Sequence, residues 1–281
     1  MKFKVLFTIL NIVLFSAFLV VFFLPVVVIS REYFVEFWRG NWFLAVFFAG
    51  SIILVNTLFI RNWTVLTALE REDWPALAQH LEKQVLYRNK TGKRYVRLLF
   101  ESLVLLGDFT ALDKLATFLK SANRVRYRQT VRGFAGAAVL SGNFRRVRVF
   151  CTDTLNEGHL DAGTADWLSL YRGLARYLDP ESAGAASDLA PLAREAPDPM
   201  VAALSAFLCS VILGKQDSPH CSVPREVLES SVQSARERLY ASFTPVKWRT
   251  YLAEASKELE IVILGKLPGQ ASAWLFPEQG F

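Results

Sequence analysis

The stretch Gly107-Asp108-Phe109-Thr110-Ala111-Leu112 has two counterparts in the chain, EDWPAL at Glu72–Leu77 and GNFRRV at Gly142–Val147. Equivalent positions of these segments are 35 residues apart. A period of this length is typical of stacked helical hairpins, in which each repeat buries its apolar face only against its neighbours. The residues that define the repeated turn are Asp73, Trp74, Gly107, Asp108, Phe109, Gly142, Asn143 and Phe144.

Each turn has the residue types needed to end one helix and begin the next. Glycine tolerates the left-handed conformation that ends many helices, and Asp or Asn is a preferred cap for the first turn of a new helix. After the first turn, Leu77, Leu81 and Val85 recur at a spacing of four residues, which places them on one helix face. Beyond residue 61 we find no sustained alternation typical of strands. We therefore expect an all-α fold.

The repeat weakens after residue 160, although helical patterns continue. The first helix of the first repeat is expected at residues 57–69, as a continuation of the second apolar run. Further helices are expected at 164–178, 183–195, 199–213, 225–240 and 246–264. Together these segments predict about four to five hairpins. The last residues, 266–281, are expected to form a tail that lies on the last helix, or to serve as a docking segment.

The repeated turn resembles that of the tetratricopeptide repeat (TPR) family, well over residues 57–160 and weakly over 161–240. The resemblance implies an α-solenoid that binds partners along the concave surface formed by the first helices of successive repeats. Large side chains stand where that family has small ones, at Phe100, Leu77, Leu112 and Val147. The hairpins should therefore be splayed more widely than in a standard member. The layout also resembles that of HemY-type membrane proteins, on architecture alone.

The first 61 residues predict a transmembrane hairpin. No charged residue lies between Val5 and Ser30, and a second uncharged run extends from Gly40 to Ile60. About 20 such residues are enough to cross a bilayer, so we expect spans at about 5–29 and 41–60. A cleaved signal peptide would have a shorter apolar core and a small-residue cleavage site, and it would still leave the second span. Two buried core helices are disfavoured by the length of the runs and their lack of a polar face.

Charge gives an expected orientation. Lys2 and Lys4 precede the first span and many Lys and Arg residues follow the second, so both termini are expected in the cytoplasm, at the inner membrane. Residues 62–150 contain 16 Lys and Arg against 7 Asp and Glu, whereas residues 151–281 contain 11 against 17. A basic half close to the spans suits the anionic cytoplasmic leaflet.

The sequence has no pattern that indicates catalysis, a cofactor or a metal. Phosphate-binding glycine loops, nucleophile elbows and metalloprotease motifs are absent from it. His220-Cys221 offers two adjacent ligands, but a structural zinc site needs about four. Cys151 and Cys209 lie in apolar helical contexts and are expected to be buried thiols. We expect a protein that is not an enzyme.

A basic cluster is the candidate binding surface. Arg124, Arg128 and Arg132 recur every four residues, so they share a face of one helix. The candidate partner-binding residues are Lys93, Arg97, Arg124, Arg128, Arg132, Arg145 and Arg148. The cluster fits an acidic or amphipathic protein segment, or anionic lipid. A solvated helix face explains it equally well. Nucleic acid is disfavoured because the distal half of the chain is acidic.

These features predict three parts: a transmembrane hairpin (1–61), a TPR-like helical repeat domain (62–265) and a C-terminal tail (266–281). The predicted function is that of a membrane-anchored scaffold or adaptor that binds partner proteins. The alternative is a structural envelope component that faces the extracytoplasmic side and supports assembly of a large machine for secretion or motility. An enzyme or transporter ranks third.

Overall fold

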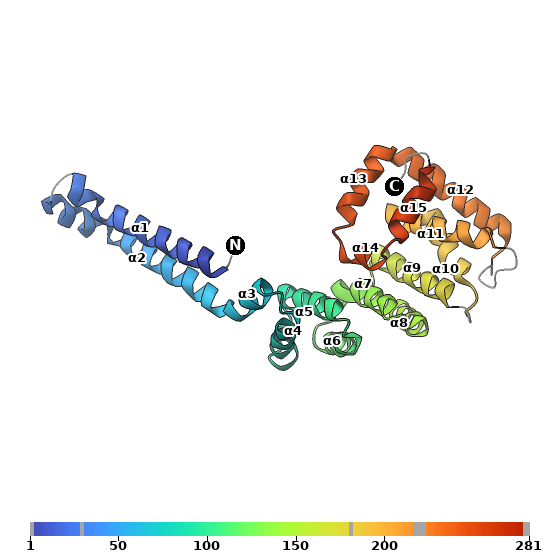
Figure 1. The fold of residues 1–281 in the computed structure, drawn as a ribbon, viewed down its shortest axis with the longest axis horizontal. Helices are drawn as coiled ribbons and strands as arrows, with labels where there is room; N and C mark the ends of the chain where they lie inside the picture. Colours follow the sequence, from blue (N-terminus) through green and yellow to red (C-terminus); the bar gives the residue numbers. More distant parts are fainter. Residues whose placement is uncertain (1–2, 29–30, 180–181, 216–222, 278–281) are drawn as a thin grey trace. The chain divides into compact units, whose positions relative to one another are not determined.

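The computed structural model describes residues 3–28, 31–179, 182–215 and 223–277. The described residues are helical with no β-strand, which confirms the all-α prediction (Figure 1). The chain forms two compact units, Met1–Leu106 and Gly107–Phe281. The boundary between them lies inside the range 62–265, at the turn between α5 (Lys93–Leu106) and α6 (Phe109–Ala122).

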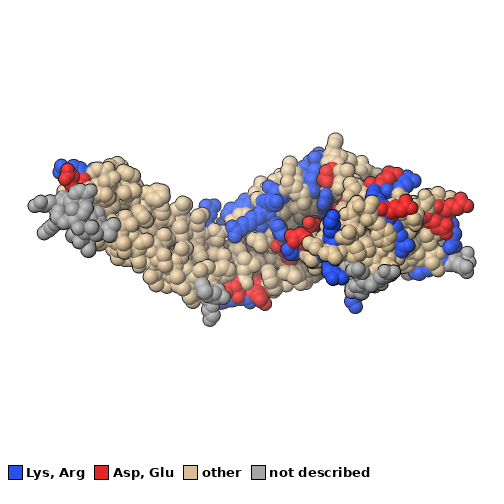
Figure 2. All heavy atoms as spheres, turned by 90° about the horizontal axis from the view of Figure 1, so that it is seen from above, with Lys and Arg blue, Asp and Glu red and all other residues tan. Residues whose placement is uncertain are grey.

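Unit 1 begins with a hairpin of two apolar helices, α1 (Phe3–Val28) and α2 (Arg31–Arg61). The Asn56 side-chain amide donates a hydrogen bond to the Asn11 Oδ1 at 2.8 Å, and the neighbouring rings of Phe7 and Phe59 stack 4.1 Å apart. Figure 2 shows the hairpin as a surface almost without charged side chains. By length and composition, Val5–Phe23 and Val35–Arg61 could each cross a membrane.

Helix α2 starts at Arg31, so the residues between the two predicted spans are helical from Arg31 onward. The helix bends at Asn41 (φ −120°, ψ 24°), where the second span was predicted to begin. The continuous helix predicted across residues 57–69 is also wrong. The backbone breaks at Asn62 (φ −101°, ψ 6°), and a separate helix, α3 (Trp63–Glu70), follows.

The rest of unit 1 packs α3 and α5 against α4 (Trp74–Glu82), which is continued by a π-helical turn, η1 (Lys83–Tyr87). Leu77, Leu81 and Val85, which were predicted to share one helix face, are buried in this packing. The other buried apolar side chains of unit 1 are Val65, Ala68, Ala78, Val96, Leu99, Phe100 and Leu103.

The repeated turns have the same backbone geometry. The cap residues Asp73, Asp108 and Asn143 have φ/ψ of −82°/74°, −84°/76° and −87°/78°. Each side chain accepts a hydrogen bond of 2.9–3.0 Å from the amide three residues later. The predicted capping role of all three residues is confirmed.

The residue before each cap is left-handed. Gly107 and Gly142 have φ of 65° and 71°, and Glu72 has φ of 53°. Glu72 therefore has the same left-handed backbone conformation as the glycines of the other two turns, although it carries a side chain. The sequence repeat is thus a repeat of backbone conformation.

Unit 2 is a stack in which consecutive helices pack against each other from α6 to α12. After α6, its helices are α7 (Arg124–Leu140), α8 (Phe144–Asn156), α9 (Ala162–Leu178), α10 (Ala185–Glu195), α11 (Pro199–Leu213), α12 (Arg225–Ser242), α13 (Pro245–Ala255), α14 (Leu259–Ile263) and α15 (Leu267–Leu275). Helix α11 is apolar on all sides, and it contacts α9, α10, α12 and α15. A helix of that composition belongs in the centre of a domain.

A buried ion cluster joins α9 to α10. The Asp188 carboxylate accepts two hydrogen bonds from Arg172, at 2.7 and 3.1 Å, and lies 3.2 Å from Arg176. Close to it, Gly173 lets α10 approach, because a Cβ there would lie 2.8 Å from the Leu189 side chain. These contacts fix the α9–α10 hairpin.

The C-terminal helices return to the earlier part of unit 2. Helix α14 packs on α7, and α15 packs on α11 (Figure 1). Gly136 of α7 makes room for this return, since a Cβ there would lie 3.0 Å from Ile263 and 3.1 Å from the Tyr171 hydroxyl. In unit 2, two first helices of the predicted hairpins, α7 and α11, are therefore contacted by the chain's own C-terminal helices.

Two details of the predicted C-terminal region differ from the structure. The helix predicted at 246–264 is two helices, because the chain turns at Glu258 (φ −81°, ψ 135°). Residues 267–275 form α15 rather than an irregular tail. Trp248 donates a hydrogen bond of 2.9 Å to Ser272 of α15, and this pair is buried.

Candidate functional site

The seven predicted binding residues do not form one surface. Lys93 and Arg97 lie on α5 of unit 1, both exposed, and Arg97 pairs with Glu101 at 2.7 Å. The other five lie on α7 and α8 of unit 2.

Two of the arginines of unit 2 hold the fold together. Arg132 donates to the Thr164 hydroxyl at 2.9 Å and lies 3.2 Å from the Asp161 carboxylate, at the start of α9. Arg148 lies 2.9 Å from Asp179, at the end of α9. Both side chains are partly buried and tie α7 and α8 to α9. We therefore remove Arg132 and Arg148 from the partner-binding set.

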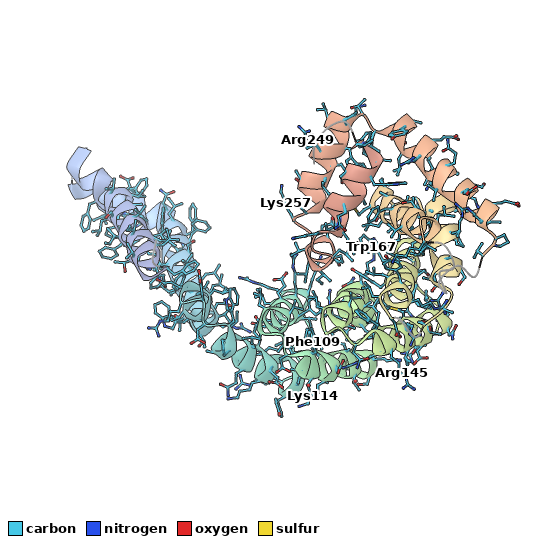
Figure 3. All side chains as sticks on the ribbon, turned by 45° about the vertical axis from the view of Figure 1, so that its right-hand side comes forward. Phe109, Lys114, Arg145, Trp167, Arg249 and Lys257 are labelled. Atoms are coloured by element: carbon cyan, nitrogen blue, oxygen red, sulfur yellow. The ribbon has the colours of Figure 1, made fainter. Side chains whose placement is uncertain are left out.

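The other three arginines are exposed. Arg124 and Arg128 lie one helical turn apart on α7, and neither forms an ion pair with a described acidic side chain. Figure 3 shows Arg145, together with Lys114 of α6, on the outer side of the unit 2 helices. Arg124 and Arg128 are the basic residues of this cluster that remain available to a ligand.

Arg124 and Arg128 line a hollow of about 330 Å³ between α7, the end of α6 and the turn after α8. Its other lining residues are Lys120, Tyr127, Thr154, Glu157, Gly158, His159 and Leu160. Lys120 pairs with Glu157, and its Nζ lies 6.0 Å from the centre of the Tyr127 ring. The hydrogen bond with Glu157 raises the pKa of Lys120, and burial raises the pKa of Tyr127.

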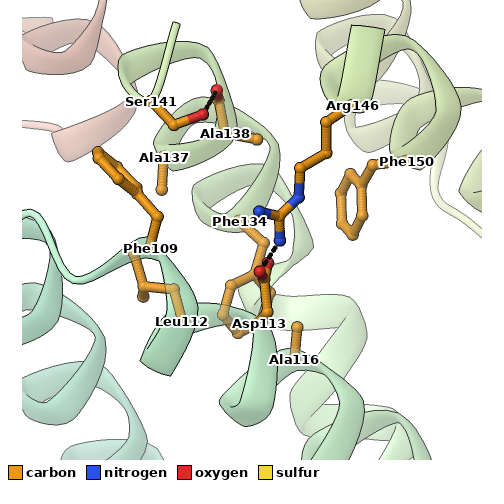
Figure 4. A pocket seen from close by; sticks show the side chains of 10 residues that line it. All are labelled: Phe109, Leu112, Asp113, Ala116, Phe134, Ala137, Ala138, Ser141, Arg146 and Phe150. Carbon is orange, nitrogen blue, oxygen red and sulfur yellow. Dashed lines mark hydrogen bonds and ion pairs between the residues drawn. The ribbon is translucent and has the colours of Figure 1, made fainter. Parts of the chain in front are cut away.

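This hollow is one end of a longer groove over α7, between α6 and α8. A middle hollow of about 420 Å³ shares Lys120, Tyr127 and Thr154 with it. The middle hollow in turn shares Asp113, Ala116, Arg146 and Phe150 with a third, smaller one (Figure 4). We call the three hollows together the α6–α8 groove.

The two ends of the groove differ chemically. The end near the start of α6 is apolar and aromatic, lined by Phe109, Phe134 and Phe150, with Leu112, Ala116 and Ala137. The ion pair between Arg146 and Asp113 spans the groove beside these rings (Figure 4). The opposite end has Arg124, Arg128 and Lys120. The groove thus changes from apolar to cationic along its length.

Helix dipoles add to the positive potential. Arginines occupy the first turns of α7 and α8, and no acidic residue is present in either turn. Positive side chains at a helix N-terminus oppose the macrodipole, which favours anions there. The arrangement is unfavourable for the isolated helices, and an anionic ligand would relieve it.

No metal-binding cluster of three or more His, Cys, Asp or Glu is present in the described part of the chain. Burial raises the pKa of Cys151 to about 12. Cys151 and Cys209 are buried, as expected, and His220-Cys221 lies outside the described residues. His80, on α4, has its pKa lowered by burial and by Arg88, Lys90 and Lys83.

Sequence reasoning missed the aromatic end of the groove. Phe109 was recognised as part of the turn, but its proximity to Phe150, 41 residues later, was not expected. The available signal was the repeat itself. Successive second helices of a stack are neighbours, so the aromatic positions of α6 and α8 share one surface.

A family model and a related protein match this chain. The model of a family described as "Uncharacterised Treponema protein" matches residues 111–277. The chain belongs to this family. A protein of Treponema pallidum (strain Nichols), described as "Uncharacterized protein", is 32% identical over 229 residues, which are 80% of this chain and 72% of the relative. No solved structure matches the chain. The matched range starts in α6 and ends after α15, so it corresponds to nearly all of unit 2.

Proposed function

We propose that this protein is a membrane-anchored scaffold or adaptor that binds partner proteins through its TPR-like helical stack. The observation that carries the proposal is the α6–α8 groove, which remains open in a chain that also has two membrane-length apolar helices. Repeat arrays of helical hairpins provide extended binding surfaces rather than enclosed reaction sites. The HemY-type resemblance supports the same class of function.

The proposed binding surface differs from the one predicted from the sequence. In unit 2, α14 and α15 lie on α7 and α11, so we no longer propose the concave face of the first helices there. The open surface lies between the second helices, α6 and α8. The partner-binding residues that we propose for unit 2 are accordingly Arg124 and Arg128, together with the aromatic residues of the groove.

We place the protein in the inner membrane, with residues 1–61 as the transmembrane hairpin and both termini in the cytoplasm. Lys and Arg near the ends of the hairpin support this orientation. The exposed cations Lys93 and Arg97 of unit 1 suit anionic lipid headgroups at the same leaflet. We propose neither a catalytic activity nor a cofactor, and the partners are proteins rather than nucleic acid.

The first test is topology in living cells. The full chain is fused at its C-terminus to a reporter active only in the cytoplasm and, in parallel, to one active only outside it. Activity of the cytoplasmic reporter is the expected result. Activity of the external reporter would overturn the cytoplasmic scaffold and favour the alternative, an envelope component that supports a large membrane machine.

The second test is contact with partners. A photoreactive amino acid replaces Val149, an exposed residue of α8, or Val246, a more exposed residue of α13. The full chain in native membranes is irradiated, and covalent adducts are resolved by mass. Discrete adducts from position 149 but not from 246 are expected. Absence of protein adducts at both positions would contradict a scaffold that acts through unit 2.

A further inference from the structure

The α6–α8 groove has a defined length and a direction. Its aromatic end lies at Phe109 and its cationic end at Lys120, and both residues belong to α6. Eleven residues of α-helix separate them, which is about 16 Å at 1.5 Å per residue. An extended chain covers that distance in about five residues.

We infer that the groove binds an extended acidic peptide segment of a partner protein, with one apolar anchor side chain and at least two carboxylates about four to five residues away. The anchor contacts Phe109 and Phe150, and the carboxylates contact Arg124 and Arg128. This inference rests on the proposed function and adds to it the chemistry and register of the partner.

Charge complementarity identifies the cationic end as a carboxylate site. The basic side chains of the middle of the groove are already engaged, since Arg146 pairs with Asp113 and Lys120 with Glu157. Arg124 and Arg128 have no such pairing with described acidic residues. A guanidinium group binds a carboxylate with two parallel hydrogen bonds, so two arginines one turn apart suit two neighbouring acidic residues.

The aromatic end provides the anchor site. Phe134 is buried, and Phe109 and Phe150 are half-buried at the edge of the small hollow. Apolar anchors in pockets supply most of the affinity of a short segment, while charged contacts around them set specificity and association rate. A segment with both elements would use both ends of the α6–α8 groove.

Other anionic partners fit less well. A nucleic-acid backbone carries a phosphate at every nucleotide, so it would place phosphates along the whole groove, beside Asp113 and Asp153 and at the apolar end, whereas the peptide segment needs carboxylates only at Arg124 and Arg128. A bilayer surface cannot follow a concave groove whose apolar end is recessed between two helices. These two partners are therefore outcomes that the experiment must separate from the peptide.

The experiment selects from a phage library of random hexapeptides. The full chain, in nanodiscs of phosphatidylcholine, is the bait, and the bound sequences are read position by position. The expected enrichment is an aromatic or aliphatic residue with two or more Asp or Glu at the other end of the peptide. Enrichment of basic peptides, of peptides without an apolar residue, or of none above empty nanodiscs would overturn the inference.

Variants of the bait then assign the peptide to the groove. Arg124→Glu with Arg128→Glu should weaken the best peptide at least tenfold, and Phe150→Ala should weaken it to a similar extent. Lys114→Glu, on the outer side of α6, is the matched control and should leave the affinity within twofold. Equal binding by all four proteins would show that the peptide binds elsewhere and would refute the assignment.

Failure of this inference can be told apart from failure of the scaffold proposal. If the library gives no peptide while the photoreactive residue at position 149 still forms protein adducts, the scaffold stands and the acidic segment is wrong. Binding of the wild-type chain, but not of the doubly substituted one, to vesicles that contain phosphatidylglycerol would assign Arg124 and Arg128 to lipid instead. That result would also overturn the inference.

Discussion

The equivalence of the repeated turns can be tested by exchanging their residues. Gly142 has φ of 71°, and a Cβ added there would have no atom within 4 Å, so Gly142→Ala changes backbone conformational energy without a steric clash. The left-handed conformation costs a residue with a side chain roughly 1–2 kcal/mol, and part of this is offset by the lower entropy of the unfolded chain. We expect Gly142→Ala to destabilise unit 2 by about 1 kcal/mol.

Replacing the left-handed Glu72 by glycine should change the free energy of unfolding in the opposite direction. Glu72 is left-handed at φ 53°, so Glu72→Gly should stabilise unit 1 by about 0.5–1 kcal/mol. Gly92→Ala is the matched control, because its backbone is not left-handed and the nearest atom to the added Cβ is 3.8 Å away. Its effect should stay within about 0.5 kcal/mol of zero.

The measurement is thermal unfolding of the full chain in detergent, followed by far-ultraviolet circular dichroism. A change of 1 kcal/mol corresponds to about 2–4 °C in Tm for unit 2 and to about 4 °C for the smaller unit 1. If Gly142→Ala left Tm unchanged, or if Glu72→Gly lowered it, the left-handed turn would not be the conformation that the repeat conserves, and our account of the 35-residue period would be refuted.

Three other predictions concern Gly173, His80 and Cys151. Gly173→Ala places a Cβ against Leu189 and should destabilise unit 2 by about 1–3 kcal/mol, measured by chemical denaturation; a neutral effect would mean that α9 and α10 are not so closely packed. The folded-state pKa of His80 is depressed, so its contribution to stability is present above about pH 6.5 and is lost as pH falls through the folded value. His80→Gln should flatten the pH dependence of Tm between about pH 7 and 5, and an unchanged profile would show that other groups cause it. The Cys151 thiol, with its pKa near 12, should react with maleimide only in denaturant, so labelling of Cys151 in the native protein, located by peptide mapping, would contradict its burial.

Local features were predictable from the sequence because local chemistry determines them. The caps at Asp73, Asp108 and Asn143 satisfy amides only three residues away, and their geometry agrees with the prediction. The apolar face of α4 was read from its spacing for the same reason. Helix breaks without Pro or Gly, such as the one at Asn62, leave no comparable signal.

The candidate site was predicted only in part, because charge patterns do not reveal distant partners. Arg128 and Arg132 are indistinguishable in the sequence, yet Arg132 is engaged by Asp161, 29 residues later, and Arg128 is not. The return of α14 to α7 was missed for a related reason. Small residues on α7, such as Gly136, indicate a close neighbour, but they do not say which segment it is.

The return of the C-terminal helices also affects how the protein is made. A simple helical stack folds through contacts between neighbouring repeats, so each hairpin can settle soon after it is synthesised. Here the Tyr171 hydroxyl lies 3.5 Å from the Glu260 carbonyl oxygen, a contact between residues 89 positions apart. Gly136, on the small-residue face of α7, lies still farther in sequence from its neighbour Ile263. Unit 2 therefore remains incomplete on the ribosome until its last helices emerge, and a truncation that removes them would expose the middle of the stack as well as its end.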